Sequence, residues 1–225
     1  MRWCLDPGET PLYGRERGCD EFEQNVLRFN GPSEARASES DDERDEVLYV
    51  LEGSGVATVG GENRELEPGT GVFVARETPW QVESADGLKL VSVLVEEPLP
   101  ASASHAVIAS GERGPATAGR EFSLLAGPEN GCESVTQFVG YIPVGRAPDH
   151  FHTYDEVVYV LEGKGALHID GETAPLRAGS CVHLPARLVH CLENTGPGEM
   201  QVLGVFRPAG SPAEAYYPDG RKAEY

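Results

Sequence analysis

Three histidines and one glutamate in the second half of the sequence have the types and spacing of a metal-binding group. His150 and His152 flank a phenylalanine in DHFHTYDE, and Glu156 ends this stretch. His190 follows a proline-containing turn in GSCVHLPARLVH. Three imidazoles and one carboxylate suit a divalent transition metal such as Fe, Mn, Ni, Co or Zn. Four protein ligands leave an octahedral ion two positions for water or substrate, which is the open arrangement of a catalytic metal.

The spacing of these residues indicates the elements that must position them. Residues i and i+2 of a strand point to the same face, so His150 and His152 should project together. A short turn after His152 can bring the carboxylate of Glu156 back beside them. His190 must then reach the group from a neighbouring strand.

Two further residues near this group could take part in chemistry. Tyr154 lies between His152 and Glu156, where a phenol can donate a hydrogen bond or act as acid or base; packing in the core is the alternative. Arg187 lies three residues before His190 and could bind a substrate carboxylate through two parallel hydrogen bonds, or face solvent. Tyr154, Arg187 and Glu156 are therefore the predicted catalytic residues.

A repeat indicates that the elements around the histidines are present twice. DEVLYVLEG at 45–53 reappears as DEVVYVLEG at 155–163, and Glu46 and Glu156 are separated by 156 − 46 = 110 positions. The same offset relates several other pairs: Gly53 and Gly163, Gly61 and Gly171, Leu66 and Leu176, and Gly69 and Gly179. Chance matches do not stay in register over such a stretch, so we predict a duplicated domain.

The boundary between the two copies is predicted near EPLPASASH (97–105), where Pro, Ala and Ser interrupt the apolar pattern. This gives an N-terminal domain over residues 1–100 and a C-terminal domain over residues 101–225. The last strand of the first copy, LKLVSVLV (88–95), has its predicted counterpart in EMQVLGVF (199–206).

The fold class follows from short β-branched runs with frequent turn residues. The 225 residues include 27 glycines and 17 prolines, and these interrupt runs such as VVYVLEG, ALHID and CVHLP every several residues. This pattern is typical of a sandwich or barrel of short antiparallel strands. We therefore predict an all-β protein.

The first copy lacks the three histidines of the second. At the same offset, the positions of His150, His152, Glu156 and His190 are taken by Ser40, Asp42, Glu46 and Trp80. A carboxylate with Asp42 nearby is a poor site for a transition metal, although it could hold a hard cation. Trp80 is expected to fill the first barrel with apolar volume. We expect the first domain to keep the fold without the metal; a metal-free ligand pocket is the alternative.

These residues resemble the two sequence motifs of the cupin superfamily. The matching residues are Gly145, His150, His152, Glu156 and Gly163 for the first motif and Gly179, Pro185, His190 and Asn194 for the second. Two departures occur. The gap from Gly145 to His150 is one residue short, and Arg187 stands where a glycine is usual. The resemblance covers about residues 35–210 and indicates a bicupin, a chain with two tandem cupin domains.

The resemblance implies two double-stranded β-helix (jelly-roll-like) barrels with one metal inside the C-terminal barrel. It implies His150, His152, Glu156 and His190 as the metal ligands. Cupins with three histidines and a glutamate are frequently dioxygenases, so the resemblance ranks an oxidoreductase acting on a small, oxygen-rich molecule first. A non-oxidative metal-dependent isomerase or lyase and a non-enzymatic small-ligand-binding cupin are the alternatives. A sensor would need a DNA-binding or effector segment, and the absence of a helix-turn-helix pattern favours an enzyme.

Charge and composition exclude several partners. The formal net charge of −19 disfavours nucleic acid and anionic membrane surfaces, which both reward clustered Lys and Arg. No apolar run approaches the roughly 20 residues that span a bilayer. The N-terminal stretch lacks the apolar segment of a signal peptide, and the five cysteines show no CxxC spacing, so we expect a cytoplasmic protein with reduced thiols. Strand edges of such barrels often pair, which predicts a homodimer; the alternative is that the two copies within one chain take the place of that dimer.

Overall fold

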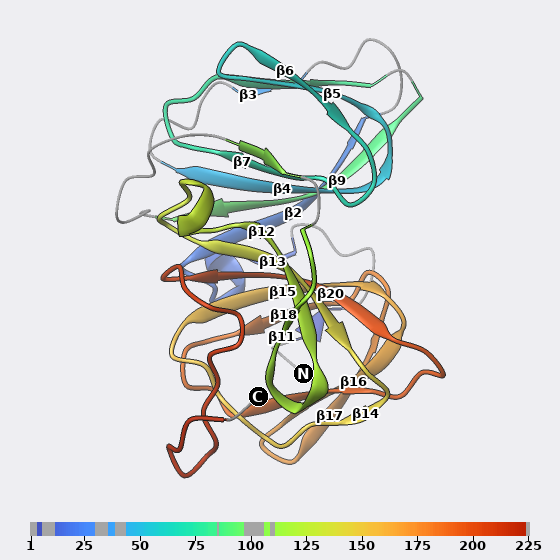
Figure 1. The fold of residues 1–225 in the computed structure, drawn as a ribbon, viewed down its shortest axis with the longest axis vertical. Coiled ribbons are helices and arrows are strands. Elements are labelled where there is room, and N and C mark those ends of the chain that lie inside the picture. The colour runs from blue at the N-terminus through green and yellow to red at the C-terminus, as the bar shows by residue number, and fades with distance from the viewer. Residues whose placement is uncertain are drawn as a thin grey trace. The chain divides into compact units, whose positions relative to one another are not determined.

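The computed structural model describes residues 4–5, 12–29, 36–38, 44–84, 86–96, 106–108 and 111–223 of the chain. Nearly all regular structure in these residues is β-strand, which confirms the predicted fold class (Figure 1). The described helices are three 3-10 turns, η1 (Arg15–Arg17), η2 (Thr117–Gly119) and η3 (Pro128–Asn130). Among the described residues, no helix is long and apolar enough to cross a membrane.

The chain folds as two compact units. We call Thr10–Gly111 with Leu125–Val135 the N-terminal barrel. We call Met1–Glu9, Glu112–Leu124 and Thr136–Tyr225 the C-terminal barrel. The domain boundary expected near residues 97–105 lies outside the described residues.

The N-terminal barrel consists of two antiparallel sheets, which lie face to face in Figure 1. The larger sheet has the order β10 (Ala106–Ile108), β7 (Gly71–Val74), β4 (Asp45–Gly53), β9 (Leu88–Val95) and β2 (Phe22–Phe29). The smaller sheet has the order β3 (Arg36–Ser38), β8 (Trp80–Glu83), β5 (Gly55–Val59) and β6 (Glu62–Leu66).

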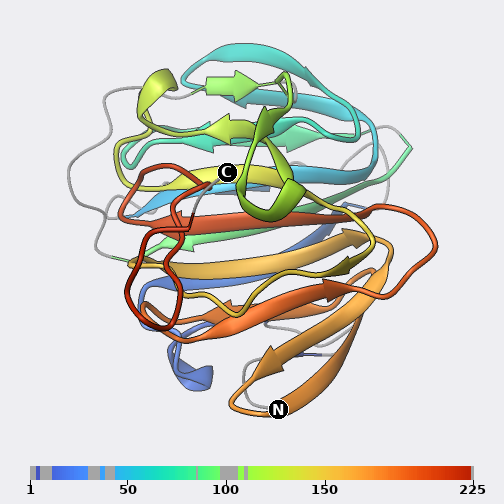
Figure 2. The same cartoon turned by 60° about the horizontal axis from the view of Figure 1, so that its bottom comes forward.

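The C-terminal barrel repeats this arrangement, as the second view also shows (Figure 2). Its larger sheet has the order β1 (Cys4–Leu5), β18 (Cys181–Leu184), β15 (Asp155–Glu162), β20 (Met200–Arg207), β13 (Thr136–Ile142), β12 (Glu121–Ala126) and β11 (Gly114–Pro115). Its smaller sheet has the order β14 (Gly145–Arg146), β19 (His190–Asn194), β16 (Lys164–Ile169) and β17 (Glu172–Arg177).

Alternate residues of the repeated strand form the core of each barrel. Val158 and Val160 of β15 are buried in one apolar cluster with residues of β16 to β20. Leu48 and Val50 of β4 occupy the same positions in the apolar cluster of the N-terminal barrel. Burial of each such side chain contributes about 1.5–3 kcal/mol, so this period-2 pattern holds the two sheets of each barrel together.

The turn after the repeated strand requires glycine in both copies. Gly53 and Gly163 have φ angles of 84° and 90°, in the left-handed region. A Cβ on Gly163 would lie 2.9 Å from the Cα of Met200, and a Cβ on Gly53 would lie 2.0 Å from the carbonyl oxygen of Gly87. The recurrence of glycine at this offset is therefore a backbone requirement.

Strand pairing corrects the predicted counterpart of the last strand. Val47 faces Val93 across β4 and β9, while Val157 faces Val205 across β15 and β20, a shift of 205 − 93 = 112. The counterpart of residues 88–95 is therefore 200–207, and the prediction of 199–206 is wrong by one residue. Equivalent residues of the two copies are still 110 positions apart at β8 and β19, since Ala57 pairs with Val82 and Leu167 pairs with Leu192. The C-terminal copy therefore has two additional residues between Leu192 and β20.

Candidate metal centre

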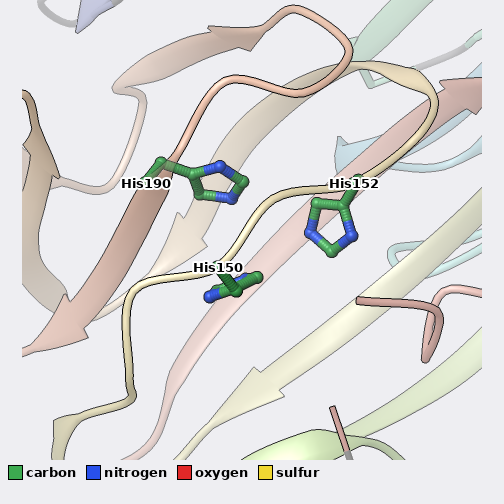
Figure 3. A group of neighbouring side chains, drawn as sticks. All are labelled: His150, His152 and His190. Carbon is green, nitrogen blue, oxygen red and sulfur yellow. The ribbon is translucent and has the colours of Figure 1, made fainter. Parts of the chain in front are cut away.

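The three histidines lie on two segments that pair in the C-terminal barrel. His150 and His190 form an isolated antiparallel bridge, with N–H···O distances of 3.0 and 2.8 Å between their backbones. His152 follows two residues after His150, and residues at this spacing in an extended segment point to the same face. Figure 3 shows the three rings turned toward a common space. Each offers a ring nitrogen, and these three atoms lie within 4.8 Å of one another.

Each imidazole is oriented by a hydrogen bond from Nδ1 to a backbone carbonyl. The acceptors are Pro148 O for His150 at 3.0 Å and Leu188 O for His190 at 2.9 Å. Glu214 O accepts from His152 at 2.7 Å. A carbonyl can only accept, so each Nδ1 carries the proton and each Nε2 keeps its lone pair. This arrangement is the usual outer support of a metal-binding histidine.

Burial keeps the three imidazoles neutral. Burial is the largest cause, and the positive charge of neighbouring groups acts in the same direction; together they lower the pKa of His150 to about 4 and that of His152 to about 3. The pKa of His190 lies well below its usual value for the same reasons. Neutral imidazoles can bind a cation without first losing a proton, so these residues fit a divalent metal.

The histidines line a cavity of about 70 Å³ inside the C-terminal barrel. Its wall also includes Arg120, Glu156, Tyr154 and Phe138. A water needs roughly 10–15 Å³ of such volume, so the cavity has room for a handful of waters or one small molecule. The cavity therefore limits a ligand to a few non-hydrogen atoms at the histidines.

Glu156 lies in this cavity with its side chain almost fully buried. Burial raises the pKa of Glu156 to about 8, although the nearby Arg120 guanidinium acts in the opposite direction. Among the described residues, the cluster of ligand atoms within 4.8 Å of one another contains the three imidazoles and not the Glu156 carboxyl group. Its role as a fourth ligand stays a prediction.

Tyr154 belongs to an aromatic wall of the cavity. Its ring stacks on His152 at a centroid distance of 4.7 Å and on Phe206 at 3.9 Å. Phe138 packs against Phe206 on the same wall. Burial raises the pKa of Tyr154 well above its usual value, so the phenol stays protonated and can donate a hydrogen bond.

The structure does not bring Arg187 into the cavity. The Arg187 side chain is exposed, and its backbone N–H donates to His152 O at 2.7 Å. Its φ of 65° explains why glycine is usual at this position. Its role in substrate binding stays a prediction.

The cation that lines the cavity is Arg120, which no sequence pattern indicated. It directly precedes β12 and donates from a guanidinium nitrogen to Leu192 O at 2.6 Å. Burial lowers the pKa of Arg120, while the neighbouring Cys191 side chain and, to a smaller extent, the Glu156 carboxyl group raise it. No motif surrounds Arg120 in the sequence, so only the folded chain could reveal it.

The other two histidines of this barrel have partners of their own. His168 Nε2 lies 2.7 Å from Glu193 Oε2, and His183 Nε2 lies 2.7 Å from Asp155 Oδ1. Neither residue lines the cavity.

In the N-terminal barrel, an apolar side chain takes the position equivalent to His190. Trp80 pairs with Val59, as His190 pairs with Ile169, and its side chain is buried in the apolar cluster of that barrel. Glu46 accepts a hydrogen bond from the Ser92 hydroxyl group. Ser40 and Asp42 lie outside the described residues.

Comparison with known proteins assigns the chain to a family. The family model described as a cupin domain matches residues 31–95 and 137–206, which together are more than half of the chain. The chain therefore belongs to the cupin family and contains two cupin domains in tandem.

Among curated relatives, "Polyketide synthase CurC" from Streptomyces cyaneus is 39% identical over 67 residues, which are 29% of this chain and 44% of that protein. An "Oxalate-binding protein" from Thermotoga maritima is 33% identical over 51 residues, 23% of this chain and 42% of that protein. The chain spans about half the length of the curated relatives that it matches.

Solved structures share the fold at low sequence identity. A putative glyoxylate-induced protein from Pseudomonas aeruginosa has a TM-score of 0.71 and 17% identity, with 85% of this chain and 77% of that chain covered. An oxalate decarboxylase from Bacillus subtilis, a protein with Mn(II) centres, has a TM-score of 0.65 and 14% identity, with 88% and 72% covered.

Proposed function

We propose that the C-terminal barrel is a metal-dependent enzyme that acts on a small, oxygen-rich carboxylate. The observation that carries this proposal is the presence of three neutral imidazoles and a half-buried arginine in one cavity of about 70 Å³. The imidazoles supply metal ligands, while the arginine supplies a fixed positive charge for an anion.

His150, His152 and His190 would hold the metal, with Glu156 as the predicted fourth ligand. When bound, a divalent transition metal supplies a Lewis acid, or a redox centre in the case of iron. His150, Glu156 and His190 are buried, which strengthens electrostatic interactions at this end of the cavity.

Arg120 orients the substrate in this proposal. One of its nitrogens is fixed by Leu192 O, so the guanidinium group is held in place before substrate arrives. Hydrogen bonds to charged groups contribute about 1.5–3 kcal/mol, and a half-buried guanidinium group can form them with an anion in the cavity. A substrate whose oxygen atoms bind the metal can place its carboxylate group against Arg120.

Glu156 and Tyr154 handle protons. With a pKa of about 8, the Glu156 carboxyl group is close to the pH at which it can accept or give a proton. Tyr154 can donate its phenolic hydrogen bond to a developing negative charge, because its own ionisation is strongly disfavoured.

A dioxygenase reaction stands first among the reaction classes. It follows from the resemblance to cupins with three histidines and a glutamate. A non-oxidative lyase reaction is the second candidate, supported by the structural likeness to oxalate decarboxylase and by the placement of Arg120 for a small dicarboxylate. Because that decarboxylase has Mn(II) centres, manganese is among the metals to test.

The experiment uses the full chain loaded separately with Fe(II) and Mn(II) under anaerobic conditions. Oxygen uptake and CO2 release are measured with oxalate, glyoxylate and a panel of diols and diketones. Oxygen consumption with the Fe(II) protein supports the dioxygenase, whereas CO2 release without oxygen consumption supports the lyase.

Arg120→Ala tests the carboxylate end of the site. We expect it to weaken binding of the carboxylate roughly 10- to 100-fold, from the contribution of a charged hydrogen bond. The control is Arg187→Ala, which removes an exposed arginine of the same barrel. Loss of binding in the control and not in Arg120→Ala would assign the anchor to Arg187 instead.

A further inference from the structure

The Nδ1 atoms of His150, His152 and His190 donate to carbonyl groups that lie at different distances along the chain. Pro148 and Leu188 each lie two residues before the histidine that they support, so those bonds form within one short segment. The acceptor for His152 is Glu214, 62 residues further along the chain. The orientation of one imidazole therefore depends on a distant segment, residues 211–223, which we call the C-terminal tail.

The C-terminal tail is folded against the segment that carries His150 and His152. Phe151 and Tyr216 form an antiparallel bridge with both N–H···O distances at 2.9 Å. Their rings stack with a centroid distance of 5.6 Å. His150 pairs with His190 on the other side, so the tail supplies the second pairing partner of this short segment.

Internal contacts hold the tail in this shape. Tyr216 Oη donates to Glu214 Oε1 at 2.9 Å, and the Ala223 N–H donates to Ala215 O at 2.8 Å. Ala213 and Ala215 are buried, and Pro212 lines the cavity. Figure 2 shows this dark-red segment doubling back on itself. The tail is thus an ordered element that reaches the cavity and the back of His152.

We propose that the C-terminal tail is a positioning element of the metal centre, so that docking of the tail and binding of the metal stabilise each other. With Glu214 O in place, the Nδ1 proton of His152 is fixed and Nε2 faces the other two imidazoles. Without it, His152 can rotate or take the other tautomer, and the site loses one oriented ligand. By linkage, a metal that needs oriented His152 must strengthen tail docking by the same factor.

This inference uses the metal binding of the proposed function and does not depend on the reaction. Its predictions are therefore binding and protection measurements, with Zn²⁺ as the probe for affinity and Co²⁺ as the probe for ligand geometry. The full chain is compared with a variant that ends at Gly210.

We expect removal of the tail to weaken Zn²⁺ binding roughly 10- to 100-fold, as loss of an outer hydrogen-bond partner does elsewhere. The visible spectrum of the Co²⁺ form should change as well, because one imidazole is no longer fixed. Circular dichroism and thermal unfolding establish that the shortened protein is folded.

Single substitutions test the same inference with the tail present. Tyr216→Ala removes the ring that stacks on Phe151, and the matched control Tyr217→Ala changes the neighbouring residue, whose ring lies under Arg221 at 5.5 Å. We expect Tyr216→Ala to weaken Zn²⁺ binding several-fold by the same mechanism. The control should bind as the wild type does.

Hydrogen exchange of the full chain provides the reciprocal measurement. Zn²⁺ should slow the exchange of amides within residues 211–223, and this protection should be absent in His152→Ala. Equal Zn²⁺ affinity with and without the tail, or unchanged exchange on metal addition, would overturn the inference while leaving the metal site intact. Failure of the wild-type protein to bind any divalent metal would overturn the proposed function together with this inference.

Discussion

The two barrels share their strand order and differ in what fills their interiors. Strand pairing identifies three pairs of equivalent positions around the cavity. In the N-terminal and C-terminal barrels respectively, these are Trp80 and His190, Ser92 and Gly204, and Asn25 and Phe138. In the N-terminal barrel the tryptophan is part of the apolar core and the serine donates to Glu46. The fold therefore does not need the histidines.

The C-terminal barrel instead has four ionisable groups with shifted pKa values in the wall of its cavity. Burial raises the pKa of Glu156 and lowers those of His150, His152 and His190. Such an interior is costly for a structural core and is typical of a functional site. The two barrels thus differ in interior chemistry, with an apolar tryptophan in one and ionisable groups in the other, and the following changes test that difference.

Matched alanine substitutions at the tryptophan and its histidine counterpart should give the largest effects. Trp80→Ala should lower the free energy of unfolding by about 3–5 kcal/mol, since it leaves a large cavity in an apolar core. His190→Ala should instead weaken Zn²⁺ binding roughly 100-fold or more, because one ligand of a small set is lost. Chemical denaturation and chelator competition measure the two effects. A large loss of metal binding in Trp80→Ala would contradict the comparison.

Glu156 should make metal affinity depend on pH. Of the four ionisable groups, only Glu156 titrates between pH 6.5 and 8, because its pKa is about 8. Burial lowers the pKa of His150 to about 4 and that of His152 to about 3, and holds the pKa of His190 well below its usual value. If the ionised carboxylate is a ligand, Zn²⁺ affinity should rise roughly 15-fold over this range, in proportion to the ionised fraction. Glu156→Gln should abolish the rise. A flat profile in the wild type would assign the metal to the three imidazoles alone.

The metal-free protein should show the opposite pH dependence of stability. The pKa of Glu156 is higher in the folded protein than its usual value of 4.5, so its protonated form favours folding. This contribution is complete below pH 4.5 and is lost as pH rises through about 8. Glu156→Gln should therefore unfold at a temperature that varies less between about pH 6.5 and pH 8.

Substitutions at the equivalent positions Ser92 and Gly204 test how the neighbour of each buried glutamate, Glu46 or Glu156, affects the protein. Ser92→Ala removes the hydroxyl donor of Glu46 and should cost about 1–3 kcal/mol of stability. A Cβ on Gly204 would lie 2.3 Å from the Phe138 ring and 2.8 Å from Glu156 Oε1. Gly204→Ala should therefore cost about 1–3 kcal/mol by displacing the aromatic wall, and should also weaken metal binding. Unchanged metal binding would show that the wall does not support the site.

The smallest expected effects lie at a turn that both barrels share. Glu77 and Arg187 are equivalent and have φ angles of 62° and 65°. Glycine relieves about 1–2 kcal/mol of left-handed strain and loses about 0.5–1 kcal/mol through its greater freedom in the unfolded chain. Glu77→Gly and Arg187→Gly should each stabilise the protein by about 0.5–1 kcal/mol in urea unfolding, without changing Zn²⁺ affinity. Reduced substrate affinity in Arg187→Gly would support the predicted role of Arg187.

The sequence by itself predicted the features that depend on local periodicity. The β class and the duplication follow from alternation and a constant offset, and both are confirmed. The projection of His150 and His152 to the same side follows from the two-residue period of a strand. These relations hold within a segment or between two copies of one segment, so no knowledge of the rest of the chain is needed.

Only the tertiary structure decided which distant groups meet at the site. Arg120 reaches the cavity from a stretch with no motif, and Glu214 orients His152 from 62 residues away. The two-residue shift before β20, which places Gly204 opposite Val158, also became visible only in the strand pairing. Contacts of this kind depend on how sheets close around a core, and residue order along the chain does not encode them in any local pattern.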